Sequence, residues 1–89
     1  MKRAAKDLRI IEIVALNVRA ARRIAGLSQE ELAFEAQIDR TYISQVERKQ
    51  RNVTISVLAR IAKALGVTPD KLLLPPVSAP SSRIKRRRP

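Results

Sequence analysis

The stretch SQEELAFEAQIDRTYISQVE, residues 28–47, decides the fold, because it has the pattern of two short helices joined by a tight turn. Ser28 with Glu31 three residues later forms a capping-box pattern, in which each side chain bonds a free backbone N–H of the other. Asp39 stands where its carboxylate can cap the second helix and complement the helix dipole. We therefore predict one helix over residues 28–36 and another over residues 39–48.

The second of these helices separates its polar side chains from its apolar ones. At about 100° per residue, Ile43 and Val46 fall on one side, which would face the rest of the domain. The opposite side carries the side-chain types that contact base edges in DNA. These side chains are Arg40, Thr41, Ser44, Gln45 and Arg48. A helix–turn–helix of this size can place its second helix in the major groove, although an ordinary solvated helix face has the same pattern.

Four successive helix starts share one pattern: an apolar residue, a polar cap, and an apolar residue five positions after the first. The polar caps are Ser28, Asp39, Thr54 and Thr68. An earlier helix runs without Pro or Gly from Asp7 to Ala25, and Gly26 is suited to end it. Agreement between these local signals predicts an all-α bundle of five helices over residues 7–74, the fifth beginning after Thr68.

The composition excludes several classes of protein. The 89 residues include neither Cys nor His, which removes disulfides, the commonest metal ligand and the commonest general base. No catalytic spacing is visible, and the carboxylates within residues 28–36 are interpreted as a solvated helix face. No apolar run is long enough to span a membrane, and no secretory signal is visible. We expect a cytoplasmic protein that is not an enzyme and has no cofactor, no metal and no membrane partner.

The net charge of +11 is concentrated at the two ends of the chain. Residues 1–9 and 75–89 sum to +3 and +5, whereas the much longer stretch 10–74 sums to only +3. We expect residues 1–6 to be a disordered basic N-terminus, and residues 75–89 to be a flexible Pro/Ser-rich linker with a basic tail. Such a distribution favours a polyanionic partner, most commonly nucleic acid, although a basic tail can also serve solubility alone.

Several runs resemble the Cro/C1-type regulators of the XRE family, which have a lambda-repressor-like DNA-binding fold. The runs are LSQEELA (27–33), TYIS (41–44), VE (46–47) and LARIAKALGV (58–67). The runs DRTYIS (39–44) and RNVTI (51–55) are also similar to controller proteins of restriction–modification systems. The resemblance implies a sequence-specific transcriptional regulator that binds double-stranded DNA as a homodimer on a two-fold operator, through the recognition helix 40–48.

The resemblance also implies roles for individual residues. Arg40, Thr41 and Gln45 would contact base edges, with Ser44 and Arg48 on the same face. The expected phosphate contacts are Gln29, Tyr42, Lys49, Arg51, Asn52 and Thr54. Arg22 and Glu47 match a pair that forms an internal salt bridge in relatives. Gln37 stands where the family commonly has Gly in the turn, and a left-handed conformation there would cost about 1 kcal/mol.

Apolar residues outside the predicted core indicate a protein partner. A short helix cannot bury three consecutive Leu at 72–74 in its own domain, so we expect a dimer interface that includes Pro69, Leu73 and Leu74. The first helix is apolar on more than one side, at Ile10, Ile13 and Leu16, which either cap an edge of the core or meet a partner. An antitoxin-type protein that binds both DNA and a second polypeptide is the alternative, and an unspecific nucleic-acid binder also stays open.

We predict that deleting residues 78–89 lowers affinity for operator and random DNA alike. Flexible cations near DNA neutralise phosphates without reading sequence, and each neutralised phosphate adds about 0.9 to the magnitude of the salt slope of log affinity. The truncation should flatten that slope by up to about four units. DNA-binding titrations of the full-length and truncated proteins at several salt concentrations check this. Equal slopes of log affinity against log salt concentration for the two proteins would exclude a tail that binds DNA.

Overall fold

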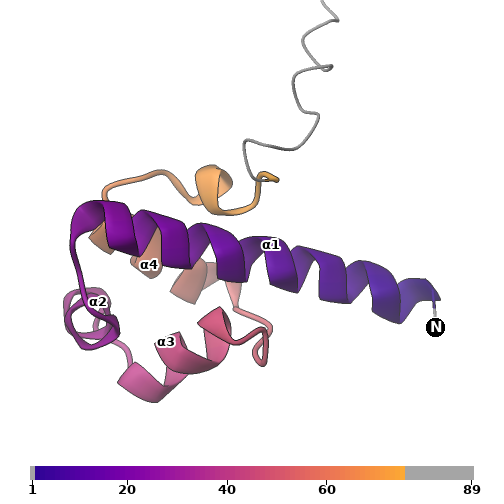
Figure 1. Ribbon diagram of the computed structural model, residues 1–89, viewed down its shortest axis with the longest axis horizontal. Helices are drawn as coiled ribbons and strands as arrows, with labels where there is room; N and C mark the ends of the chain where they lie inside the picture. The colour runs from indigo at the N-terminus through magenta and orange to yellow at the C-terminus, as the bar shows by residue number, and fades with distance from the viewer. Residues whose placement is uncertain (1, 76–89) are drawn as a thin grey trace, which may run out of the picture.

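The computed structural model describes the backbone of residues 2–75, with side chains from Arg9 onward. Its elements are α1 (Lys2–Ala25), α2 (Gln29–Ala36), α3 (Arg40–Glu47), α4 (Ile55–Leu65) and the 3-10 helix η1 (Pro69–Leu72). The long helix α1 runs across the molecule, with α2 and α3 on one side of it and η1 on the other (Figure 1). The two helices predicted within residues 28–48 are thus α2 and α3.

The prediction of a fifth α-helix is wrong, because η1 is a single 3-10 turn. Thr68 makes no side-chain cap hydrogen bond, and only six residues separate it from Pro75, too few for a stable α-helix. The turn nevertheless holds a fixed place. The Asn17 amide of α1 donates to the carbonyl oxygens of Leu72 and Leu74 at 2.9 and 2.7 Å. The described part of the chain is therefore an all-α fold of four helices and one short turn.

One hydrophobic core joins all five elements. Its largest fully buried side chains are Val18, Leu32, Ile43, Val46, Ile61 and Leu72. The packed pairs of elements include α2 with α3, α2 with α4, and η1 with both α1 and α4. Because apolar burial is the main stabilising term in a domain of this size, this shared core holds the five elements together.

Side-chain caps fix the starts of two of the three shorter helices. At α2, the Ser28 hydroxyl accepts from the Glu31 N–H at 3.0 Å, and a Glu31 carboxylate oxygen accepts from the Ser28 N–H at 2.8 Å, which completes the capping box. At α4, the Thr54 hydroxyl accepts from the Val57 N–H at 3.2 Å. The predicted cap at Asp39 is wrong, because this side chain makes no cap hydrogen bond. Packing of Ile43 and Val46, rather than a side-chain cap, holds α3 in place.

The first helix begins earlier than the sequence predicts. It starts at Lys2, within the segment that we expected to be disordered, and runs through to Ala25. Ala, Lys, Arg and Leu are among the best helix formers, and no Gly or Pro interrupts them before Gly26. The linker and basic tail predicted over residues 75–89 lie outside the described residues, apart from Pro75. Among the described residues, no helix is long and apolar enough to cross a bilayer.

The turn between α2 and α3 depends on a left-handed residue that is not glycine. Gln37 has φ 60° and ψ 46°, and its N–H closes the end of α2 on the carbonyl oxygens of Ala33 and Phe34. Gly26 and Gly66 have similar conformations at the ends of α1 and α4, where they avoid the steric penalty of a Cβ atom. Gln37 therefore carries backbone strain that the surrounding packing outweighs.

We predict that Gln37→Gly raises the free energy of unfolding by about 1 kcal/mol, because glycine removes the left-handed penalty. Urea denaturation of the purified protein measures the change. Gln37→Ala is the matched control: it also removes the side chain but keeps the penalty, so its stability should stay near the wild-type value. A Gly variant less stable than the Ala variant would contradict this account of the turn.

Candidate nucleic-acid interface

The helix α3 buries one side and leaves the other accessible. Ile43, Val46 and Glu47 are its buried residues. Of the predicted base contacts, Arg40, Thr41 and Arg48 are exposed, whereas Ser44 and Gln45 are half-buried. The predicted set therefore lies together on α3 and its C-terminal cap, with no member fully buried.

The predicted phosphate contacts border this surface. Lys49, Arg51 and Asn52 are exposed in the loop after α3, and Thr54 is exposed at the start of α4. Gln29, at the start of α2, and Tyr42, on α3, are half-buried. Lys49 has a left-handed conformation, with φ 64°, where the chain leaves α3, and the sequence did not predict it. The loop that follows lies beside α3, because Arg51 contacts Gln45 and Tyr42.

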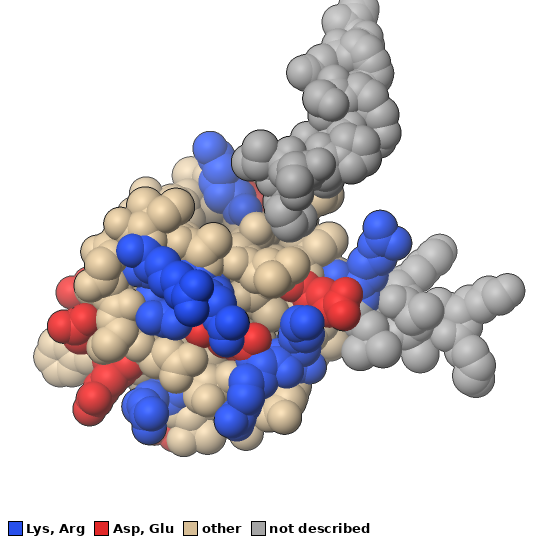
Figure 2. All heavy atoms as spheres, in the orientation of Figure 1, with Lys and Arg blue, Asp and Glu red and all other residues tan. Residues whose placement is uncertain are grey.

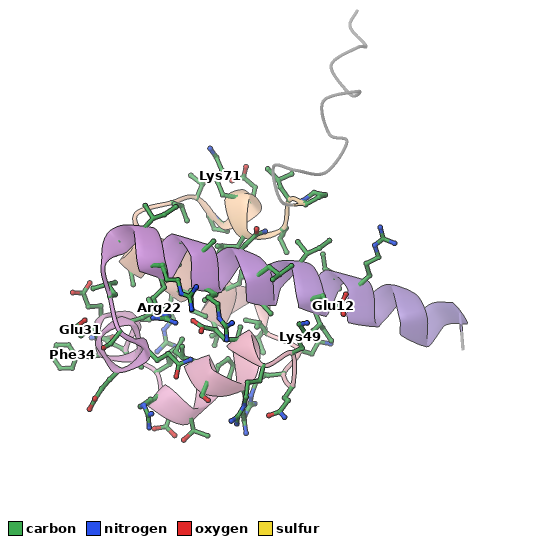
Figure 3. All side chains as sticks on the ribbon, in the orientation of Figure 1. Glu12, Arg22, Glu31, Phe34, Lys49 and Lys71 are labelled. Atoms are coloured by element: carbon green, nitrogen blue, oxygen red, sulfur yellow. The ribbon has the colours of Figure 1, made fainter. Side chains whose placement is uncertain are left out.

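Charged side chains are unevenly distributed over the surface. Lys and Arg side chains lie over the middle of α1 and along the side where α3 lies, whereas acidic side chains gather over α2, with a further acidic patch over α1 at Glu12 (Figure 2 and Figure 3). The exposed acidic residues of α2 are Glu30, Glu31 and Glu35. Phe34 projects from the same helix, 83% exposed and pointing away from the domain (Figure 3). A polyanion is therefore attracted to the α3 side and repelled from the outer edge of α2.

Three of the predicted DNA contacts form one unit. The Arg51 Nε and Nη2 atoms lie 3.0 and 2.8 Å from the Oε1 atom of Gln45. The guanidinium carbon of Arg51 also lies 4.2 Å from the centroid of the Tyr42 ring, within the range of a cation–π interaction. This link was not predicted from the sequence, because a loop residue and two helix residues meet only once the loop has folded back on α3.

A buried carboxylate joins α1, α2 and α3. Arg22 makes a two-point contact with Glu47, with Nε 2.7 Å from Oε2 and Nη2 3.0 Å from Oε1. Gln29 Nε2 and Arg19 Nε donate to the same Oε1 atom at 3.0 and 3.4 Å. The Glu47 side chain has no exposed surface, and Arg22 lies on the side of α1 that faces α2 and α3 (Figure 3). The pair expected from the resemblance is thus the centre of a larger network.

The environment of Glu47 favours the ionised form. Burial by itself would raise the pKa of this carboxyl, but hydrogen bonds from Arg22 and Gln29, the charge of Arg22 and the bond from Arg19 together lower it. The same hydrogen bond raises the pKa of Arg22. The sequence contained a signal for Arg19, which stands three residues before Arg22 and so shares its helix face. It contained no comparable signal that Gln29 would donate to Glu47.

The predicted dimer residues lie at η1, on the opposite side of α1 from α3. Pro69 is exposed, and Leu73 and Leu74 are 42% and 51% exposed, whereas Leu72 is fully buried. Leu73 lines a small, mainly apolar cavity together with Ile10 of α1 and with Arg51 and Asn52 of the loop after α3. Leu16 and Ile10 are themselves exposed. The structure therefore leaves an apolar surface that runs from η1 onto the neighbouring face of α1.

Comparison with known proteins agrees with this geometry. Residues 18–72 match the family model HTH_3, described as helix-turn-helix. Control protein C.SmaI from Serratia marcescens is 56% identical over 64 residues, which cover 72% of this chain and 76% of that protein. The crystal structure of the hypothetical transcription factor NHTF from Neisseria superposes with a TM-score of 0.74 and 44% identity, over 88% of this chain and 85% of that one.

A further similar structure contains DNA. It is the restriction–modification controller protein C.Esp1396I, crystallised as a tetramer in complex with its natural 35 base-pair operator. Its chain is 38% identical and superposes with a TM-score of 0.66, over 71% of this chain and 83% of that one.

We predict that Glu47→Ala lowers the free energy of unfolding by about 3–5 kcal/mol, because it leaves Arg22 partly buried without its partner and Gln29 without its acceptor. Thermal or urea unfolding near neutral pH measures this loss. Glu35→Ala is a control on an exposed carboxylate of α2 and should cost much less. Equal losses for the two variants would contradict a special role for the buried carboxylate.

The same network predicts how stability depends on pH. Because the pKa of Glu47 is lower in the folded protein than in the unfolded chain, its stabilising effect is present above the unfolded value of about 4.3. This effect is lost as the pH falls through the lower, folded value. Glu47→Gln, which keeps the shape but cannot ionise, should therefore lose less stability than the wild type as the pH falls below about 4. If the free energies of unfolding of the wild type and of Glu47→Gln fell equally below about pH 4, this prediction would be contradicted.

Proposed function

This chain belongs to the helix-turn-helix family, as a Cro/C1-type DNA-binding transcriptional regulator closely related to restriction–modification controller proteins, and we propose that it binds a two-fold operator as a homodimer through α3. The observation that carries the proposal is the accessible face of α3, with the polar and cationic side chains of Arg40, Thr41, Ser44, Gln45 and Arg48. These side chains can donate hydrogen bonds to base edges, and the buried side of the helix fixes their orientation.

The two groups of contacts would have separate tasks. The residues around α3, from Gln29 at α2 to Thr54 at α4, would hold phosphates on both sides of the groove and so set the register of the helix. Arg40, at the first turn of α3, would make the two-point contact with guanine that is the commonest specific contact in protein–DNA complexes. Affinity would therefore come mainly from the surrounding residues, and sequence preference mainly from α3.

The second copy would dock at η1. Leu73 and Leu74 remain about half exposed although Leu72 enters the core, and the adjoining face of α1 adds further apolar surface. A two-fold axis here would leave both α3 helices free, because η1 lies across α1 from α3 (Figure 1). The operator-bound tetramer of C.Esp1396I is compatible with two such dimers side by side on a longer operator. A different polypeptide on the same surface, as in an antitoxin, is the alternative occupant.

We predict that Arg40→Ala weakens binding to the selected operator by about 1–3 kcal/mol and relaxes preference at one base position in each half-site. Competition binding against operators changed one base pair at a time measures both effects. Lys63→Ala, which removes an exposed charge from α4, is the control and should preserve the preferences. If Arg40→Ala weakens binding to every sequence equally, Arg40 contacts a phosphate and does not read a base.

We predict that Leu73→Asp and Leu74→Asp shift the protein from dimer to monomer, because a charge in an apolar interface is costly to bury. Sedimentation velocity over micromolar concentrations measures the change. Lys71→Asp, a charge change at an exposed position of η1, is the control and should leave more dimer than either Leu variant. A wild-type protein that is monomeric at high micromolar concentration, and unaffected by either Leu substitution, would contradict the η1 interface.

A further inference from the structure

The contact between Arg51 and Gln45 fixes the orientation of an amide group on the reading face. Guanidinium groups have five N–H donors and no acceptor, so only the oxygen of the Gln45 amide can face Arg51. Both the Nε and Nη2 atoms of Arg51 donate to this one oxygen, at 3.0 and 2.8 Å. The two donors lie on one edge of the guanidinium and approach the oxygen from the same side, so the oxygen is held toward Arg51. What Gln45 still offers is its NH2 group, which can only donate.

Two further contacts keep this arrangement in place. The carbon atom of the Arg51 guanidinium lies over the Tyr42 ring, 4.2 Å from its centroid. This contact with Tyr42 holds the guanidinium that in turn holds the Gln45 amide. The backbone at the start of the loop is closed onto α3, with the Gln50 N–H donating to the Gln45 carbonyl oxygen at 2.8 Å. The Gln45 amide therefore meets DNA with its orientation already chosen.

We propose that Arg51 is a positioning residue that makes Gln45 a donor-only reader, so that Gln45 selects guanine over adenine at its base pair. A free Gln amide recognises adenine by accepting from N6 and donating to N7. With its oxygen held toward Arg51, Gln45 can accept from N6 only by turning its amide group and breaking these bonds. Guanine presents two acceptors in the major groove, O6 and N7, and these match the remaining NH2 donors. This inference rests on the proposed function, because it assumes that α3 lies in the major groove.

Selection of bound sites from a random DNA pool tests the proposal, with the wild type and Arg51→Met compared. Met keeps an unbranched stem of similar length but has no N–H group. The base pair that Gln45 reads is identified as the position whose preference disappears in Gln45→Ala. At that position the wild type should favour guanine over adenine by about tenfold, and Arg51→Met should reduce the ratio to about one or reverse it.

Internal controls separate positioning from a general loss of binding. Arg51→Met should weaken affinity for all sequences if Arg51 also touches a phosphate, but the preference at the Arg40 position should not change. Tyr42→Leu, which removes the ring face under the guanidinium, should shift the preference in the same direction, whereas Tyr42→Phe should not. Circular dichroism of each variant verifies that it is folded.

Two results would overturn the proposal: adenine selected by the wild type at the Gln45 position, or an unchanged guanine preference in Arg51→Met. A third result, a folded wild type that selects no consensus at all, would overturn the proposed function and the positioning role together. This third result is distinguished from the other two because the base pair contacted by Arg40 then shows no base preference either.

Discussion

The buried carboxylate of Glu47 is the interaction on which the rest of the structure depends. It is the last residue of α3, it has no exposed surface, and its four hydrogen bonds come from Arg19 and Arg22 of α1 and from Gln29 of α2. An unpaired charge in this position would cost several kcal/mol. Removing any one of these helices from its place would therefore leave the carboxylate partly unsatisfied. The network thus specifies how α3 lies against α1 and α2, while the apolar core supplies most of the stability.

This constraint places the surfaces of the molecule on different sides. With Ile43, Val46 and Glu47 turned inward, the polar residues of α3 face outward beside the basic loop, and the acidic edge of α2 lies away from it (Figure 2). The apolar surface at η1 lies across α1. The proposed DNA face is therefore centred on α3 and the proposed subunit face on η1, and the two approach each other where Leu73 and Arg51 line one small cavity. Gln29, one of the proposed phosphate contacts, donates one amide N–H to Glu47 and has a second amide N–H that this bond does not use.

Local signals in the sequence predicted most of the fold. The capping box at Ser28, the Thr54 cap and the apolar spacing gave α2, α3 and α4 nearly at their observed bounds. Whether Asp39 would cap depends on tertiary structure and was out of reach, whereas the short distance from Thr68 to Pro75 was a signal in the sequence against a fifth α-helix. The candidate site also divides into features that local signals predict and features that they do not. Which residues of α3 share its accessible face follows from helical periodicity. The Arg51 link to Gln45 and the share of Arg19 and Gln29 in the Glu47 network follow from contacts between elements, which periodicity does not encode.

The spacing of the two half-sites tests the central claim most directly, because a rigid dimer with two outward α3 helices requires one distance between them. Affinity would be measured by titration on the selected operator and on versions with one to five base pairs inserted at its centre. A dimer of this kind should have a single optimal spacing, with half-sites about one helical turn apart, and its affinity should fall to that of one isolated half-site when about half a turn is added. Affinity that does not change with spacing would contradict a homodimer that binds DNA through two fixed copies of α3.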